Sequence, residues 1–398
     1  MRFFQQFCIG ILSLCVCGVC FSNNLDSRIE ALGKIKRKDL LKHRMEIAVM
    51  ALKASDTRTA AEHLDFVLAD IESFYTDTEA ARKARSLWAN EGRKTFKGEP
   101  YERAMAYYYR GLTYLMNGDY DNAHASFKGG QLQDAMAEGH DKRTDFVLLM
   151  AMQTWAAKLM RQESLAEQSQ QELKLYRQGF DVPSPDTHTM VVIETGLGPR
   201  KIRDGVSGER LVFRRGKKFD DSYASIVIGD YQQDLRPIED IYYQASTRGA
   251  RAIDFVNRGK AVFKEQWSGT NSSIADIAAT AALFTRTYND VRIVEANVNG
   301  IAVNAGVGEK YAHQLDQLAL AASVVSLLSS KVKAKSDTRA WTNLPDHVHI
   351  GFIAKSKIVG EKELPIVLFD RHRNELETIS VPIQTSDEGG SIAWFKVH

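Results

Sequence analysis

The stretch "YERAMAYYYRGLTYLMNGDYDNAHASF" (101–127) decides the expected fold. Its apolar residues recur at helical spacing around a Gly-Asp pair, which predicts two short helices joined by a turn. A tetratricopeptide repeat is such a pair, about 34 residues long, with large side chains packed around two small ones. With Ala104 as its first residue, the residues at the diagnostic core positions are Tyr107, Gly111, Tyr114, Ala123 and Phe127.

Further helix pairs flank this repeat. A weaker copy is expected at 41–74, and a pair with poorer matches at about 143–177. One more unit, including a helix at 77–92, has to fill the gap between the first two copies. Such units must stack to bury a continuous core. We therefore predict a tetratricopeptide-like solenoid of helical hairpins over residues 23–180.

The first helix of each pair in such a solenoid lines a concave groove. The predicted groove residues are mostly apolar, namely Met45, Val49, Leu52, Met105, Tyr108, Leu112, Leu115 and Met116. An apolar groove that contains Met suits an apolar helix or peptide of a partner protein. The alternative is that the chain fills the groove with its own elements. Tyr109 is expected toward solvent or a neighbouring repeat.

A second domain is expected after "DVPSPDTHTM" (181–190), where prolines and polar residues mark a boundary. Strands are expected at 190–195, 210–214, 223–228, 347–354, 363–370, 376–383 and 391–397. Asn299-Gly300 predicts a hairpin turn, and helices are expected at about 236–263, 272–286 and 308–333. Residues 188–398 therefore predict an α+β domain with antiparallel strands, strand-rich from 345 and ending in a small sheet.

Residues 1–22 predict a signal peptide. Arg2 precedes an apolar run at 9–19 that is too short to span a bilayer comfortably. Cleavage is expected before Cys20 or after Ser22. All four cysteines lie in this segment, so the mature chain has no disulfide and no thiolate metal site. "CGVC" (17–20) departs from a bacterial lipobox, so lipidation of Cys20 and a plain secretory signal both stay open. Either outcome indicates the periplasm or the periplasmic face of the outer membrane.

Charge argues against a nucleic-acid partner. The 398 residues include 52 basic and 50 acidic ones, a net charge of +2. "KIKRKDLLKHR" (34–44) is basic and follows the leader, and it either lies on anionic lipid or is a solvated helix face. "GLGPRK" (196–201) is either a small anion site or a strand exit.

Two histidines raise a metal hypothesis. His347 and His349 are two apart on an expected strand and share a face, and Asp370 or His372 from a neighbouring strand would complete a site. The sequence has no Gly-x-Ser-x-Gly elbow and no His-Glu-x-x-His helix. We expect a protein that is not an enzyme and has no cofactor. The alternative is an envelope enzyme or a metal-dependent binding protein that uses this His/Asp site.

Three segments carry a family resemblance. They are "FKGEPYERAMAYYYRGLTYLMNGDYDNAHASF" (96–127), "VVIETGLGPRKI" (191–202) and "SDTRAWTNLPDHVHIGF" (336–352). They resemble a poorly characterised family of bacterial envelope lipoproteins with tetratricopeptide-like helices. That family is often encoded beside lipoproteins resembling the curli secretion pore subunit (CsgG-like), and sometimes beside one resembling a penicillin-binding-protein activator. The resemblance implies a scaffold in an outer-membrane secretion or assembly complex, with envelope proteins such as a CsgG-like lipoprotein as partners.

Overall fold

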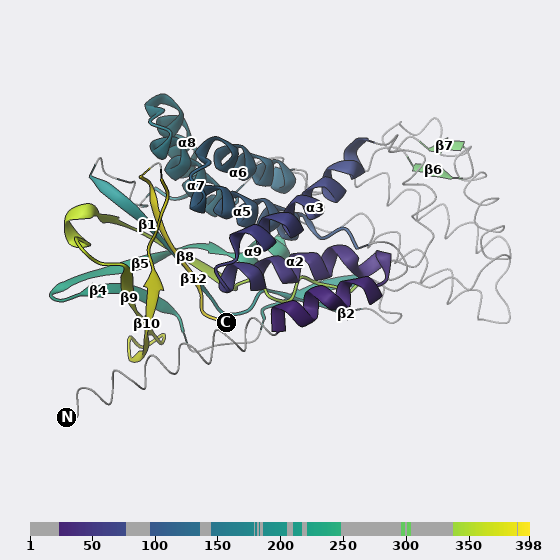
Figure 1. The fold of residues 1–398 in the computed structure, drawn as a ribbon. Coiled ribbons are helices and arrows are strands. Elements are labelled where there is room, and N and C mark those ends of the chain that lie inside the picture. Colours follow the sequence, from purple (N-terminus) through teal and green to yellow (C-terminus); the bar gives the residue numbers. More distant parts are fainter. Residues whose placement is uncertain are drawn as a thin grey trace.

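The structure is a computed structural model of the whole chain. It describes residues 24–76, 96–135, 145–178, 180, 183, 186–204, 210–216, 221–247, 296–298, 301–303, 337–387 and 389–398. Within these ranges the protein is a mixed α+β fold, with helices in the N-terminal half and mostly strands in the C-terminal half. Figure 1 shows the helices packed along one side of the main sheet.

Consecutive helices form hairpins in the described N-terminal half. A helical segment at 24–31 and a short 3₁₀ helix (Leu32–Lys34) come first. The hairpins that follow are α2 (Arg37–Lys53) with α3 (Thr57–Thr76), α5 (Pro100–Met116) with α6 (Tyr120–Ala135), and α7 (Val147–Leu159) with α8 (Glu163–Tyr176). These bounds agree with the helix pairs expected from the sequence. The helix expected at 77–92 lies outside the described residues.

Glycines set the spacing between the helices of the central hairpin. A methyl group added at Gly111 of α5 would overlap the ring of Phe127 on α6. On the other side of α6, a Cβ at Gly130 would lie 2.9 Å from Leu149 of α7. The helix α6 therefore approaches both of its neighbours closely. At the contact with α5 the glycine belongs to α5, and at the contact with α7 it belongs to α6.

The C-terminal half forms one eight-stranded sheet in the order β10-β9-β4-β5-β8-β1-β12-β11. Its strands are β1 (Thr187–Thr195), β4 (Tyr223–Ile228), β5 (Tyr231–Asp240), β8 (His347–Ala354), β9 (Glu363–Phe369), β10 (Glu375–Pro382), β11 (Gln384–Thr385) and β12 (Ser391–Lys396). The pair β1–β12 is parallel, and the other pairs in the sheet are antiparallel.

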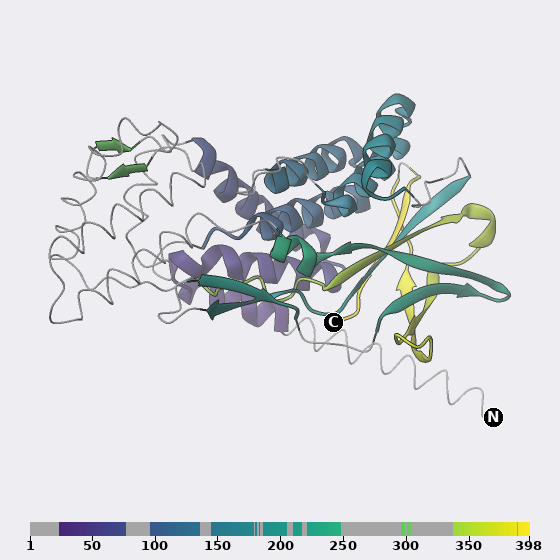
Figure 2. The same ribbon diagram turned by 180° about the vertical axis from the view of Figure 1, so that it is seen from behind.

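Two separate ribbons accompany the sheet. One pairs β2 (Arg200–Asp204) with β3 (Arg210–Arg214), and the other pairs β6 (Ala296–Val298) with β7 (Ile301–Val303). The second ribbon confirms the antiparallel pairing expected on either side of Asn299-Gly300, two residues that lie outside the described ranges. Figure 2, seen from behind, shows the β2–β3 ribbon in front of the first helices.

The structure corrects two expectations. The sheet is larger than the small antiparallel one expected, because β1 inserts between β8 and β12 and pairs in parallel with the latter. The prediction of a helix at 236–263 is wrong at its start, because residues 236–240 belong to β5. The helix observed there, α9, spans Ile241–Thr247. Pro237 is tolerated in β5 because it lies at a bulge in the pairing with β8. The helices expected at 272–286 and 308–333 lie outside the described residues.

The sheet buries both faces around β1. Met190 and Val192 belong to a core shared with the helices, whereas Val191 and Ile193 belong to a second core. That second core also includes side chains of β4, β9 and β10. Burial on both faces explains why β1 reads as a continuous apolar run rather than an alternating one.

Candidate functional site

The predicted groove is closed within the chain. The side chains of Met45, Val49, Leu52, Met105, Tyr108, Leu112 and Leu115 are at most 3 % exposed, and Met116 is partly buried against the same core. This core also contains residues of β1, β8 and β12. Burial by the chain's own elements was the alternative that the sequence left open, and it is the arrangement that the structure has.

The repeat-core residues lie inside the helical half. Tyr107, Gly111, Ala123 and Phe127 are buried. Tyr114 is only partly buried, and the guanidinium of Arg110 lies 3.6 Å from its ring centre. The expectation for Tyr109 is wrong. Its side chain is fully buried, because it packs from α5 against the C-terminal half, with its ring 5.5 Å from that of Trp341.

A buried carboxylate joins α5 to the sheet. Glu194 on β1 accepts hydrogen bonds from Tyr108 Oη at 3.0 Å, Tyr109 Oη at 2.7 Å and Trp394 Nε1 at 2.9 Å. The ammonium of Lys396 lies 3.7 Å from the same carboxylate, and both side chains are 0 % exposed. Burial lowers the pKa of Lys396 to about 8. The donors come from one helix and one strand, so this cluster fixes the position of α5 on the sheet.

A second buried acid joins the start of α5 to two C-terminal segments. Glu102 accepts hydrogen bonds from Lys201 Nζ at 2.6 Å and from the backbone N–H of Trp341 at 2.8 Å. It also accepts one from the N–H of Glu99 at 2.6 Å, within a capping box that begins the helix. One carboxylate therefore both caps α5 and binds the domain that follows it.

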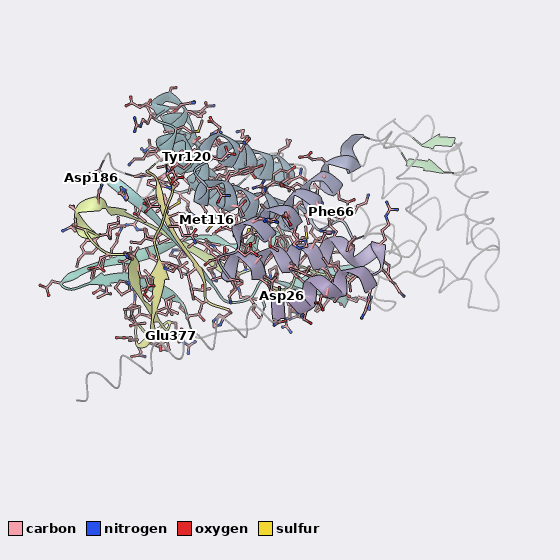
Figure 3. All side chains as sticks on the ribbon, in the orientation of Figure 1. Asp26, Phe66, Met116, Tyr120, Asp186 and Glu377 are labelled. Atoms are coloured by element: carbon pink, nitrogen blue, oxygen red, sulfur yellow. The ribbon has the colours of Figure 1, made fainter. Side chains whose placement is uncertain are left out.

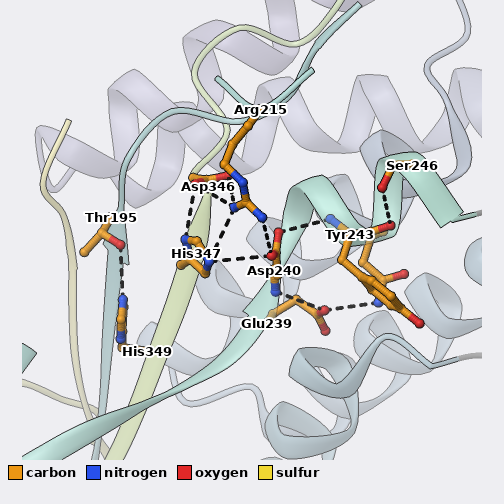
Figure 4. A network of polar contacts seen from close by, with 10 residues as sticks. Thr195, Arg215, Glu239, Asp240, Tyr243, Ser246, Asp346, His347 and His349 are labelled. Carbon is orange, nitrogen blue, oxygen red and sulfur yellow. Dashed lines mark hydrogen bonds and ion pairs between the residues drawn. The ribbon is translucent and has the colours of Figure 1, made fainter. Parts of the chain in front are cut away.

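A third buried acid caps α7. Glu239 on β5 accepts the N–H of Leu148, in the first turn of α7, at 3.1 Å. It also accepts the amide of Gln244 at 3.1 Å, and Figure 4 shows it beside Asp240. Burial raises the pKa of Glu239 to about 8. The strand thus supplies an acceptor for a helix terminus that has no cap from its own preceding residue.

The polar network in Figure 4 gathers around Arg215, just after β3. Its guanidinium donates to both oxygens of Asp346 at 2.9 Å and to Asp240 at 2.6 Å. The Nδ1 atom of His347 lies 3.2 Å from Asp346, and the Tyr242 ring lies 4.8 Å from the guanidinium. Two carboxylates neutralise this arginine, so the cluster ties three segments together and offers no free positive charge.

The metal site hypothesised from the histidines is not assembled in the described residues. The rings of His347 and His349 are 6.4 Å apart. His349 is buried beside Thr195 at 3.1 Å, and burial lowers its pKa to about 3. His372 and Asp370 follow β9, which β4 and β5 separate from β8. Among the described side chains, no group of three His, Cys, Asp or Glu is placed to hold a metal ion.

The three segments that carry the family resemblance meet in space. Tyr108, Tyr109 and Glu102 come from the first segment, Glu194 and Lys201 from the second, and Trp341 from the third. The junction of helices and sheet is therefore the feature that these segments build together.

Comparisons with known proteins add no relative. No family model, no curated protein and no solved structure matches the chain. Within the described ranges, no helix combines the length and apolar composition needed to cross a bilayer. Cys20 lies outside these ranges, so its lipidation stays a prediction.

Sequence reasoning missed the acids that join the two halves. Of these acids, Glu194 is the one that the sequence comes nearest to indicating as buried, because it directly follows four apolar residues in "MVVIET" (190–195). A buried acid requires hydrogen-bond donors, and the tyrosine run of α5 contains them. Neither segment alone indicates that the two would meet.

Proposed function

We propose that the chain is a non-enzymatic scaffold of the bacterial cell envelope, with tetratricopeptide-like hairpins that bind partner proteins in an outer-membrane secretion or assembly complex. The expected partners are envelope proteins, a CsgG-like lipoprotein among them. The expected location is the periplasm or the periplasmic face of the outer membrane, with a lipid anchor if Cys20 is modified.

One observation carries the proposal. The first helices of the hairpins are held by the C-terminal half, through Glu194 for α5 and Glu239 for α7. We therefore expect a partner protein to contact the second helices, α3, α6 and α8. Each presents a large apolar side chain to solvent: Phe66 is 42 % exposed, Leu132 53 % and Leu175 78 %. Figure 3 labels Phe66 on α3.

Site-specific photocrosslinking in the native envelope tests this. A photoreactive amino acid replaces Leu132 or Leu175 in separate strains, and crosslinked products are identified by mass spectrometry. Both substituted side chains are exposed, so the fold should tolerate the change. We expect both positions to capture the same envelope lipoprotein, of the CsgG-like type.

The matched control places the photoreactive residue at Val359, which is 78 % exposed and lies in the turn between β8 and β9. This position should not capture that lipoprotein. Absence of any crosslinked envelope protein at both helix positions, or equal capture at Val359, would count against the proposal.

A further inference from the structure

Unpaired cations gather where the chain enters the described structure. The side chains of Arg28, Lys34, Lys36 and Arg37 are all exposed, and none forms an ion pair with a described residue. The exposed acids in the same segment are Asp26, labelled in Figure 3, and Glu30. By contrast, Asp39 is paired with Arg339 at 2.7 Å.

The β2–β3 ribbon adds two more exposed cations. Its register places Arg200 directly opposite Arg214, so the two arginine side chains project from the same face of the ribbon. Like charges in this position destabilise a strand pair. Neither side chain has a carboxylate partner in the described part of the chain, where Arg200 Nε donates a hydrogen bond to the carbonyl of Arg215 at 3.4 Å.

The other face of the ribbon packs inward, which directs the arginine pair away from the protein. Lys201 and Phe213 are paired on that inner face. Lys201 binds Glu102, and the Phe213 ring lies 5.9 Å from that of Tyr101. Strand residues alternate between faces, so Arg200 and Arg214 lie on the outer side.

Phe96 connects the two basic segments. Its N–H donates to the carbonyl of Lys38 at 2.7 Å, at the start of α2. The ammonium of Lys201 on β2 lies 5.4 Å from its ring centre. The first turn of α2 and the ribbon are therefore neighbours. Together Arg28, Lys34, Lys36, Arg37, Arg200 and Arg214 define what we call the basic surface.

The charge of the basic surface is local. Six cations and the two exposed acids Asp26 and Glu30 give a balance of +4 (6 − 2), whereas the whole chain carries only +2. Clusters of arginine and lysine bind anionic lipid headgroups.

We propose that the basic surface lies on an anionic lipid bilayer and binds the phosphate groups of its lipids. The arginine pair on the ribbon supplies two guanidiniums for a phosphate, and the cations at 28–37 supply the surrounding positive field. This would orient the hairpins relative to the membrane whether or not Cys20 carries a lipid. The proposal is independent of which protein binds the outer helices.

Vesicle binding by the mature chain, produced from Asn23 onward without the leader, tests the proposal. The probes are vesicles of phosphatidylcholine alone and vesicles that also contain phosphatidylglycerol, at low salt. We expect binding only to the second kind, weakening as salt increases. Each cation removed should lower the apparent affinity on the order of fivefold, in the variants K34Q/K36Q/R37Q and R200Q/R214Q.

The control variant K174Q/R177Q removes two exposed cations at the end of α8 and should bind like the wild type. Circular dichroism should show all variants folded, since every substituted side chain is exposed. Three results would overturn the proposal: no binding to phosphatidylglycerol vesicles, unchanged binding of R200Q/R214Q, or an equal loss in K174Q/R177Q. The last would indicate a response to net charge alone.

Discussion

At the scale of single residues, the structure places ionisable groups where helices meet strands. Glu102, Glu194 and Glu239 are each at most 3 % exposed, and each accepts bonds from another part of the chain. Replacing one partner of a buried pair costs more than the pair itself contributes to stability. These acids are therefore better understood as fixing one arrangement of the two halves than as sources of stability.

Glu239 should make stability depend on pH. Burial raises its pKa to about 8 in the folded protein, against about 4.3 in an unfolded chain. The folded state thus binds the proton more tightly, so this contribution to stability is complete below about pH 4 and is lost as pH rises through about 8. Glu239→Gln removes the titration and keeps one acceptor for the Leu148 N–H.

The measurement is the free energy of unfolding in urea, at pH 5 and pH 8.5, for wild type and variant. All other groups are shared, so the difference between the proteins isolates Glu239. We expect wild type to lose more stability than the variant on going to pH 8.5, by a few kcal/mol. Parallel pH profiles would show that this carboxyl is not held neutral by burial.

At the scale of elements, local patterns predicted most of the described fold. The helix pairs and the strands at 210–214, 223–228 and 347–354 have the expected bounds. The strand β5 was missed because "YQQDLRPIED" is polar and contains a proline, and most of its side chains are not buried. The parallel pairing of β1 with β12 joins Thr189 to Ser391, and no local pattern reports such distant pairing.

The candidate site was less predictable than the fold. Helical spacing correctly marks Tyr108 and Leu112 as one apolar face, but spacing cannot tell whether a partner or the chain itself covers that face. The hydrogen bonds to Glu194 show that the chain itself covers this face. Its two tyrosine partners are 86 and 85 residues away in the sequence, too far for a local pattern to connect them. Only the three-dimensional pairing reveals them.

Close packing of α5 on α6 gives a prediction for Gly111. Alanine favours a helix over glycine by about 1 kcal/mol, yet a Cβ here would overlap the Phe127 ring. We expect Gly111→Ala to lower the free energy of unfolding by about 1–3 kcal/mol, measured by urea denaturation. The second substitution in G111A/F127L should restore part of the loss by making room.

Gly33 provides the matched control, because nothing lies within 4 Å of a Cβ added there. Gly33→Ala should change stability by no more than about 0.5 kcal/mol. If Gly111→Ala proved as harmless as the control, the two helices would not approach as closely as the structure has them.

At the scale of the whole molecule, the hairpins and the sheet share one core. Tyr108 and Met105 belong to the same cluster of buried side chains as Val192 and Trp394. The face that a tetratricopeptide-like solenoid would offer to a partner is occupied by the chain itself. The outer helices and the basic surface are then the parts through which we expect the protein to meet the envelope.

The central claim is that the sheet docks on the inner face of the hairpins, and a double-mutant cycle between Tyr109→Phe on α5 and Glu194→Leu on β1 tests it most directly. The free energy of unfolding is measured for the wild type, both single variants and the double variant. The 2.7 Å hydrogen bond between these side chains predicts a coupling of about 1 kcal/mol or more. A coupling within about 0.3 kcal/mol of zero would contradict the docking.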